Sequence, residues 1–402
     1  MKVLFISRWF PHPLDNGSKI RVFNLIKWLS SCHEVDLISF ASEGVGDERL
    51  DDMRRYCRHV DLAPYRSFQP GRLKALLGFM SRRPRSVVDT HSVEMQRLVE
   101  RSVRERSFDV VIGSEIDMAA YARQVPSTPM IFEDVELTVL YERFSKEGHH
   151  LARLRSWLTW WKLSLYVSDL LGVCDGCTVV SEQERERILQ VSPGYRSIAI
   201  VPNGVDVAHY ASDFGAPETD TLVYPGALTY SANFDAMDFF LREVFPLIRA
   251  KRPNVRVSIT GRLDGVPVDR LPGGDGVILT GYLDDVRPAI ARSWACVVPV
   301  RIGGGTRLKI LEALALGTPV VATSKGSEGL DLEPGRDLLV ADEPADFAAA
   351  VLRLLQDPAL REMLSRNGRR AVEAKYDWRT IGRQFNDFVE TVVAQAEQAC
   401  TG

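Results

Sequence analysis

Short apolar runs alternate with helical patterns along the first half of the chain. Val3–Ile6 is the first run; a loop and a helix from Ser18 to Leu29 follow it, and Val35–Phe40 is the second run. Continuous apolar runs separated by helices are typical of a parallel sheet whose strands are buried on both faces. We therefore predict an α/β fold. Further strands are expected at Val60–Pro64, Val110–Gly113 and Met130–Phe132.

The same alternation begins again after residue 220, following a stretch rich in glycine, proline, serine and acidic residues. A chain of 402 residues is long enough for two domains, and such a polar stretch is typical of an exposed connection between them. We predict a first domain of residues 1–205, a linker of residues 206–220, a second domain of residues 221–380 and a final helix within residues 381–402. Strands of the second domain are expected at Leu222–Tyr224, Val255–Ile259, Val277–Leu279 and Ala295–Val300, and its first helix at Ala236–Ile248.

Glycines follow the strands of the second domain where each apolar run ends. They are Gly226, Gly261, Gly281 and the triplet Gly303–Gly305. Because the carboxyl ends of parallel strands share one edge of a sheet, these loops are expected to share a ligand. The triplet also leads from Thr306 into a helical pattern, and a glycine loop that opens a helix presents amides to a phosphate. An ordinary strand–loop–helix crossover has the same pattern, so the phosphate site is a hypothesis.

Composition narrows the class of protein only slightly. A net charge of −3 argues against a general nucleic-acid binder, and six scattered cysteines do not form a disulfide framework. No apolar run approaches the ~20 residues of a transmembrane helix, so the expected location is the cytoplasm.

Four segments, taken in order, resemble the family 4 (group 1) glycosyltransferases. They are VVSE at Val179–Glu182, VPNGVD at Val201–Asp206, PVRIGGGTRLKILEALALGTPVVA at Pro299–Ala322 and YDW at Tyr376–Trp378. The resemblance implies the GT-B fold, in which two Rossmann-like domains face each other across a cleft and the C-terminal helix crosses back to the first domain. It also implies a hexosyltransferase that moves a sugar from a UDP- or GDP-sugar to an acceptor, with retention, without a metal and without a further cofactor.

The resemblance implies roles for particular residues. Glu312 matches the glutamate that holds the donor ribose, whereas Gly304 replaces the family's first glutamate. Many relatives clamp the diphosphate with an Arg and a Lys that the Thr229–Phe239 loop lacks, so Arg307 and Lys309 are the expected substitutes. The implied donor site comprises Gly17, Gly226, Gly261, Arg262, Tyr282, Arg301, Gly303, Gly304, Gly305, Thr306 and Glu312. The catalytic candidates are Asp134, Glu136, Arg307 and Lys309, and Asn16 and Arg21 are expected on the acceptor side.

Asp134 and Glu136 follow the strand at Met130–Phe132, which places them at the ligand edge of the first sheet. The alternative is that they only cap a helix by accepting hydrogen bonds from its first amides.

Two stretches of the first domain differ from ordinary core. Pro70–Arg85 is expected to form a basic amphipathic helix, and no acid occurs from Arg66 to Val88. Such a helix suits a membrane interface or an anionic partner, but it can equally be a surface helix with a solvated basic side. His149–Leu171 carries three tryptophans, which suit an interface or the core. We predict a lipid-linked or small glycan acceptor of a cell-envelope or extracellular polysaccharide pathway, and peripheral contact with the inner face of the plasma membrane.

Other functions share these features. A nucleotide-sugar 2-epimerase of the GT-B fold and a non-catalytic nucleotide-sugar-binding protein would carry the same donor motifs. A dinucleotide-dependent oxidoreductase is disfavoured, because no G-x-G-x-x-G follows Val3–Ile6.

Overall fold

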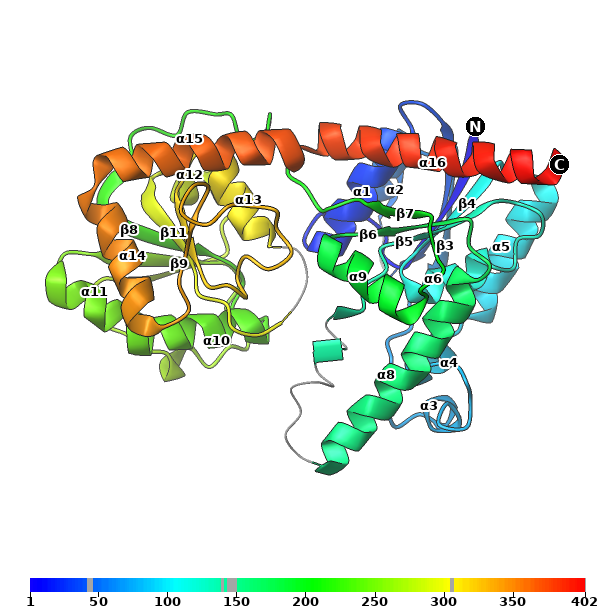
Figure 1. The fold of residues 1–402 in the computed structure, drawn as a ribbon, viewed down its shortest axis with the longest axis horizontal. Helices are drawn as coiled ribbons and strands as arrows, with labels where there is room; N and C mark the ends of the chain where they lie inside the picture. The colour runs from blue at the N-terminus through cyan, green and yellow to red at the C-terminus, as the bar shows by residue number, and fades with distance from the viewer. Residues whose placement is uncertain (42–45, 139–140, 143–149, 304–306, 402) are drawn as a thin grey trace. The chain divides into compact units, whose positions relative to one another are not determined.

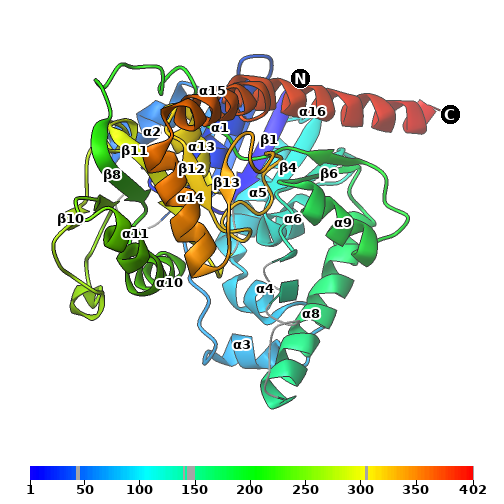
Figure 2. The same cartoon turned by 60° about the vertical axis from the view of Figure 1, so that its left-hand side comes forward.

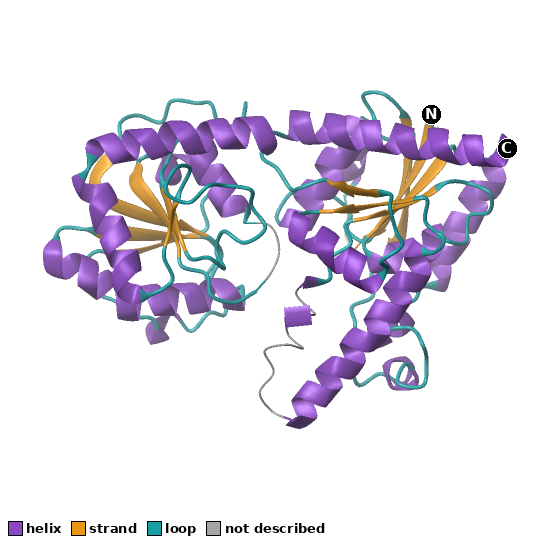
Figure 3. Cartoon of the chain, viewed as in Figure 1, coloured by secondary structure: helices purple, strands orange, loops and turns teal. Residues whose placement is uncertain are grey.

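The computed structural model describes residues 1–41, 46–138, 141–142, 150–303 and 307–401. The chain forms two compact units (Figure 1). Unit 1 comprises Met1–Asn203 together with Ile381–Gly402, and unit 2 comprises Gly204–Thr380. The α/β prediction is confirmed, because each unit is built on one parallel sheet with helices on both faces (Figure 3).

Unit 1 contains a seven-stranded parallel sheet in the order β3-β2-β1-β4-β5-β6-β7. The order reverses between β1 and β4, which is the point where ligands bind in open α/β sheets. Within β1, Val3 to Ser7 are all buried, as expected for a strand covered on both faces. The strands are β1 (Lys2–Ser7), β2 (Glu34–Ala41), β3 (His59–Pro64), β4 (Val110–Ser114), β5 (Met130–Glu133), β6 (Gly176–Val179) and β7 (Ile198–Ile200).

Polar side chains cap some of the helices of unit 1. Asn16 Oδ1, for example, accepts a hydrogen bond from Lys19 N at 3.0 Å and fixes the start of α1. The helices of residues 1–203 are α1 (Gly17–Leu29), α2 (Asp47–Arg54), α3 (Leu73–Leu77), α4 (Arg85–Thr90), α5 (Val93–Glu105), α6 (Ile116–Ala122), α8 (His150–Leu171) and α9 (Glu182–Val191).

The last helix, α16 (Trp378–Thr401), packs on unit 1 from Ile381 onward. Its Gly382 lies so close to Trp28 that an added Cβ would come within 2.2 Å of the indole ring. Gly176 of β6 similarly has no room for a Cβ, because the side chains of Phe388 and Val392 cover it. The first domain is therefore completed by the distant end of the chain.

Unit 2 contains a six-stranded parallel sheet in the order β10-β9-β8-β11-β12-β13. α14 covers β11, β12 and β13 on one face (Figure 2), and α13 packs on β11 and β12 with α15 behind it. The strands are β8 (Glu218–Pro225), β9 (Arg256–Thr260), β10 (Val277–Gly281), β11 (Ser293–Val298), β12 (Val320–Ala322) and β13 (Leu339–Val340). The helices are α10 (Ser231–Phe239), α11 (Phe245–Lys251), α12 (Arg287–Ala291), α13 (Leu308–Ala315), α14 (Pro344–Gln356) and α15 (Pro358–Lys375).

Three expectations about local structure differ from what the structure shows. The first helix of unit 2 begins at Ser231 rather than Ala236, and a π-helical turn, Phe240–Val244, joins α10 to α11. The predicted linker, residues 206–220, lies within unit 2, where Val207 is buried and β8 already begins at Glu218.

The third difference concerns the basic stretch Pro70–Arg85, which does not form one helix. Between Pro70 and Pro84 only Leu73–Leu77 is helical; Gly78 follows that turn, and a Cβ added there would lie 3.1 Å from Ala75 O and from Arg85 Cα. Across the described residues, no helix has the length and hydropathy needed to span a bilayer.

Candidate active site

Glycines bring the loops of unit 2 together at the carboxyl edge of its sheet. Gly261 follows β9 with φ +109°, and an added Cβ would lie 2.6 Å from Ala227 N in the loop after β8. Gly281 and Gly303 also adopt left-handed conformations, with φ +70° and +90°. Only glycine reaches these conformations without strain. The loops after β8, β9, β10 and β11 therefore meet at one edge; Gly304, Gly305 and Thr306 lie outside the described residues.

Lys309 stands at the centre of this edge, in the first turn of α13. Its Nζ donates to the Tyr224 hydroxyl and to Asn233 Oδ1, each at 2.8 Å. A Cβ added to Gly226 would lie 2.9 Å from the same Nζ, so the lysine head lies directly against the glycine loop. Burial lowers the pKa of Lys309 to about 7. The site therefore holds an ammonium group that is readily stabilised by an incoming negative charge.

Glu312 lies three residues further along α13 and thus on the same face of the helix as Lys309. Its Oε1 accepts a hydrogen bond from the Tyr210 hydroxyl at 3.1 Å. Burial raises the pKa of Glu312 above its usual range. Within the described part of the chain, Oε2 has no hydrogen-bond partner, which leaves one carboxylate oxygen available for a ligand hydroxyl.

The arginines expected to help Lys309 are engaged elsewhere in unit 2. Arg307 is only 7% exposed, and its Nη2 donates to Gly303 O at 3.0 Å. Arg301 pairs with Asp235 of α10 at 2.9 Å and stacks over Phe239. Both side chains therefore hold the loop after β11 to its surroundings, and Lys309 lies closer to the glycine loop after β8.

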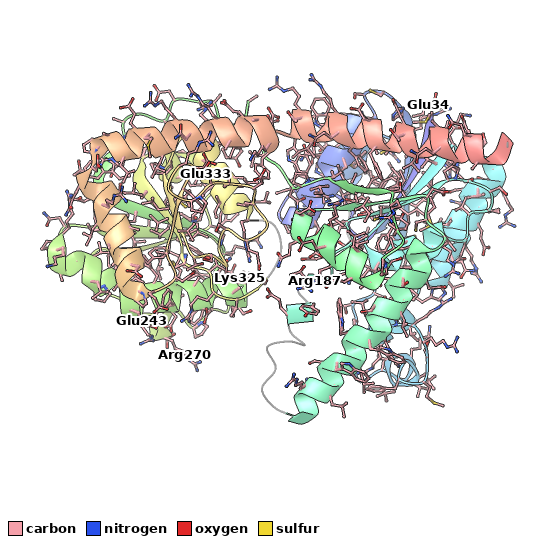
Figure 4. The ribbon with its side chains drawn as sticks, in the orientation of Figure 1. Glu34, Arg187, Glu243, Arg270, Lys325 and Glu333 are labelled. Carbon is pink, nitrogen blue, oxygen red and sulfur yellow. The ribbon has the colours of Figure 1, made fainter. Side chains whose placement is uncertain are left out.

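Two other predicted donor residues form an exposed pair beside these loops. The guanidinium of Arg262 lies 5.4 Å from the ring centre of Tyr282, which is 63% exposed. Lys325, labelled in Figure 4, follows β12 at the same edge and pairs with Glu328. Cations from several loops thus surround the edge.

Unit 1 has a cavity of about 360 Å³ at the carboxyl edge of its own sheet. Asp134 and Glu136 line it, as predicted for the ligand edge, and so do Arg8 and Glu115. Glu115 and Asp134 have φ of +69° and +58°, which is uncommon for residues other than glycine and often marks functional sites. The other residues that line this cavity are Trp9, Ser18, Ser86, Val87, Ile116, Asp117 and Leu163.

Glu115 is a strongly perturbed acid of this cavity. Burial raises its pKa to about 8, and its Oε1 accepts a hydrogen bond from Trp9 Nε1 at 2.7 Å. Arg8 Nη1 donates to Asp117 Oδ2 at 3.0 Å beside it. The cavity therefore combines carboxyl groups with one arginine and one indole, a set suited to a polar ligand rich in hydroxyl groups.

Arg21 is not available to an acceptor, contrary to our prediction. It is 1% exposed, and its Nε pairs with Glu133, which is fully buried, at 2.6 Å. Its Nη1 donates to Val201 O at 2.8 Å and to Asn203 Oδ1 at 3.2 Å. Arg21 is thus a structural residue that connects α1 to β5 and to the end of the first segment of unit 1, at Val201 and Asn203. Asn16 caps α1 and Gly17 is the first residue of that helix.

Sequence reasoning missed several residues that the fold brings to these edges. Arg8, Trp9 and Glu115 directly follow β1 and β4, so the rule that placed Asp134 after β5 could have found them. Tyr224 and Asn233 had no such signal, because only the fold shows that they contact Lys309.

Comparison with known proteins agrees with this architecture. A family model described as "Glycosyl transferases group 1" matches residues 219–357. YtcC of Bacillus subtilis, which is named as a glycosyltransferase, is 31% identical over 329 residues, covering 73% of this chain and 75% of that protein. A 44.6 kDa protein in the cps region of Klebsiella pneumoniae is 19% identical over 94% of this chain and 97% of its own length.

The fold also matches solved structures. HepE of Anabaena, solved in complex with UDP, superimposes with a TM-score of 0.67 at 14% identity, covering 97% of this chain and all of that one. The two Rossmann-like units are therefore those of the GT-B class. The match to YtcC extends over most of both chains, and the region matched by the family model contains the glycine-loop edge of unit 2. The chain therefore belongs to the group 1 glycosyltransferases.

Proposed function

We propose that this glycosyltransferase takes its sugar from a UDP- or GDP-sugar and transfers it to a glycan acceptor, with retention and without a metal ion. The donor assignment rests on one observation: Lys309 and Glu312 lie on the same face of α13, beside the loop at Gly226. A diphosphate against Lys309 would place a ribose within reach of a residue one helical turn away. The UDP bound to the structurally similar HepE supports this class of donor.

The chemistry follows from the charge on the leaving group. As the bond between the sugar and the diphosphate breaks, negative charge accumulates on the phosphate oxygens. A preorganised cation and backbone amides stabilise that charge more than they stabilise the substrate, which lowers the barrier. Lys309 is held by Tyr224 and Asn233, so it needs no reorganisation when the charge develops.

We assign the acceptor to the cavity of unit 1. Its carboxyl groups can accept hydrogen bonds from sugar hydroxyls, and Arg8 can donate to them. The relative in the cps region of Klebsiella pneumoniae supports a role in polysaccharide synthesis. The same carboxyl groups would also suit a nucleotide-sugar 2-epimerase, which makes that activity the second candidate.

A panel of nucleotides and nucleotide sugars tests this function by thermal shift. A ligand at 100 times its Kd should stabilise the protein by ~2.7 kcal/mol, so UDP or GDP and one of their sugars should raise the melting temperature. The stabilising sugar, offered with oligosaccharide acceptors, should then give a product with retained anomeric configuration by NMR, and EDTA should not reduce the rate. Stabilisation without turnover would indicate a binding protein, and an epimerised donor would indicate the epimerase. If no nucleotide stabilises the protein, the donor assignment fails.

Glu312→Ala should weaken binding of the nucleoside diphosphate by ~1.5–3 kcal/mol, the range for a hydrogen bond to a charged group. The reason is that the free Oε2 would be the acceptor for a ribose hydroxyl. Isothermal titration calorimetry measures the change. Glu243→Ala is the matched control, because Glu243 is an exposed glutamate of the same unit (Figure 4). Equal affinities for the wild type and Glu312→Ala would remove Glu312 from the donor site.

A further inference from the structure

Unit 1 exposes a concentrated group of large apolar side chains on α3, on the turn that follows it and on one side of α8. Figures 1 and 2 both show α3 beside α8. Met80 is 90% exposed and Leu73 is 73% exposed, although both are strongly apolar. We call this group the α3–α8 surface. Its apolar members are Leu73, Leu76, Leu77, Phe79, Met80, Leu154, Trp157, Leu158, Trp161 and Leu165.

The opposite side of α8 is ordinary core. Leu163, Val167 and Leu170 are buried against the sheet of unit 1, whereas Trp157 and Trp161 stack on each other at 6.2 Å and remain about half exposed. The predicted core role therefore holds for one side of α8, and the other side is exposed. An apolar side exposed next to a satisfied core side indicates a surface that something else covers.

Polar contacts hold α3 in the position that exposes these side chains. Lys162 Nζ of α8 donates to Phe79 O at 2.6 Å, which fixes the turn after α3 to α8. Arg85 donates to Ala75 O at 2.9 Å and to Pro70 O at 2.8 Å, and its guanidinium lies 3.9 Å from the ring centre of Phe79. These contacts fix the turn after α3, so its apolar side chains are held in exposed positions.

Cations surround the apolar side chains. Arg82 and Arg83 are exposed and form no salt bridge with any described residue, and residues 66–88 contain no acid. Arg153 and Arg155 are exposed at the start of α8. A cavity of about 670 Å³ is lined by residues of α8 and of the turn after α3. Its lining includes apolar residues, Met80 and Trp161, and basic residues, Arg82 and Arg83. The acid that lines it, Asp169, pairs with Arg123.

We infer that the α3–α8 surface docks on a membrane of anionic phospholipids. Apolar and tryptophan side chains would enter the boundary between headgroups and acyl chains, where tryptophan is favoured, and the arginines would lie against the lipid phosphates. A second copy of the chain is a poorer occupant, because two such surfaces placed face to face would bring the same unpaired arginines together. This inference concerns binding alone and does not depend on the proposed sugar transfer.

Co-sedimentation of the full chain with vesicles tests the inference. Binding to equimolar phosphatidylglycerol and phosphatidylcholine is expected at low salt, with little binding to phosphatidylcholine alone. Each basic residue near an anionic leaflet is worth ~1 kcal/mol, so Arg82→Glu with Arg83→Glu should weaken binding by roughly tenfold or more. Salt at 1 M should release the protein, because the Debye length falls to ~3 Å. Arg85 is left unchanged, since it braces α3.

Arg54→Glu with Arg55→Glu is the matched control, since both arginines are exposed in the same unit, Arg54 at the end of α2 and Arg55 directly after it. This variant should bind vesicles as the wild type does, and all variants should melt at similar temperatures. Met80→Asp should weaken vesicle binding and leave the sedimentation coefficient of the protein in solution unchanged. Absence of vesicle binding at low salt would overturn the inference, as would equal losses in the two charge variants. A dimer in solution that Met80→Asp dissociates would assign the surface to a second copy instead.

Discussion

Replacing Lys309 by methionine is expected to lower the kcat of sugar transfer by roughly 10²–10³-fold, the usual cost of removing one group that stabilises developing negative charge. Methionine keeps an unbranched side chain of similar length but carries no charge. Lys251→Met is the matched control, because Lys251 ends α11 shortly before β9 begins and therefore lies at the opposite, amino edge of the sheet. Equal losses in the two variants would show that Lys309 has no special role.

The lowered pKa of Lys309 allows its role to be tested by nucleotide binding as well, without measuring turnover. With a pKa of about 7, Lys309 is largely neutral at pH 8 in the protein without nucleotide, whereas a bound diphosphate favours its ammonium form. Nucleotide binding at pH 8 should therefore take up close to one proton. The terminal phosphate, with a pKa near 6, is already ionised there and contributes little. Affinity should fall as the pH rises above about 7, by at most tenfold per pH unit.

Calorimetry at pH 8 in buffers of different ionisation enthalpy measures the number of protons taken up. A slope near one is expected for the wild type and for Lys251→Met, and a slope near zero for Lys309→Met. If the observed binding enthalpy does not depend on the buffer in the wild type, Lys309 does not gain a proton with the nucleotide.

Arg21→Met should lower the free energy of unfolding of unit 1 by about 3–5 kcal/mol, because it leaves Glu133 buried without its partner. Glu133 is fully buried, and among the described residues its other side-chain hydrogen bond is the one that Oε2 accepts from Ser114 Oγ. Burial already raises the pKa of Glu133, so the loss of Arg21 should favour its protonated form further. The double variant Arg21→Met with Glu133→Met should recover much of the loss, because apolar residues of similar volume often replace a buried ion pair at little cost.

Hydrogen exchange in β5, which carries Glu133, and in the neighbouring β4 reports the stability of unit 1 separately from that of unit 2. Arg54→Met is the control, since Arg54 pairs with Asp51 on the surface at 2.8 Å and should contribute only about 0–1 kcal/mol. A loss below ~1 kcal/mol in Arg21→Met would show that water or another group compensates Glu133.

The strands could be predicted from sequence because burial on both faces leaves an unbroken apolar run, as in β1 and β4. The region around Lys309 could be predicted because its glycine loop and its helix follow each other directly in the sequence. The place of Arg21 could not, because a charged residue on a helix is normally solvated and only the fold shows that Glu133 faces it. The basic stretch at Pro70 mixes apolar and basic residues, which predicts one amphipathic helix. The structure has only the turn Leu73–Leu77, and Arg85 donates to Ala75 O from beyond that turn, a tertiary contact that the sequence does not show.

The return of α16 to unit 1 has a consequence for how the protein forms during translation. The side chains of Ile381, Phe385 and Val389 are buried, yet they leave the ribosome only after all of unit 2 has been made. Synthesis at roughly 5–20 residues per second leaves unit 1 waiting on the order of ten seconds or more, with the patch around Trp28 and Gly176 uncovered. Unit 2 is continuous in sequence, so it can finish folding first. In the nascent chain, the domain that is made first is therefore the last to be completed.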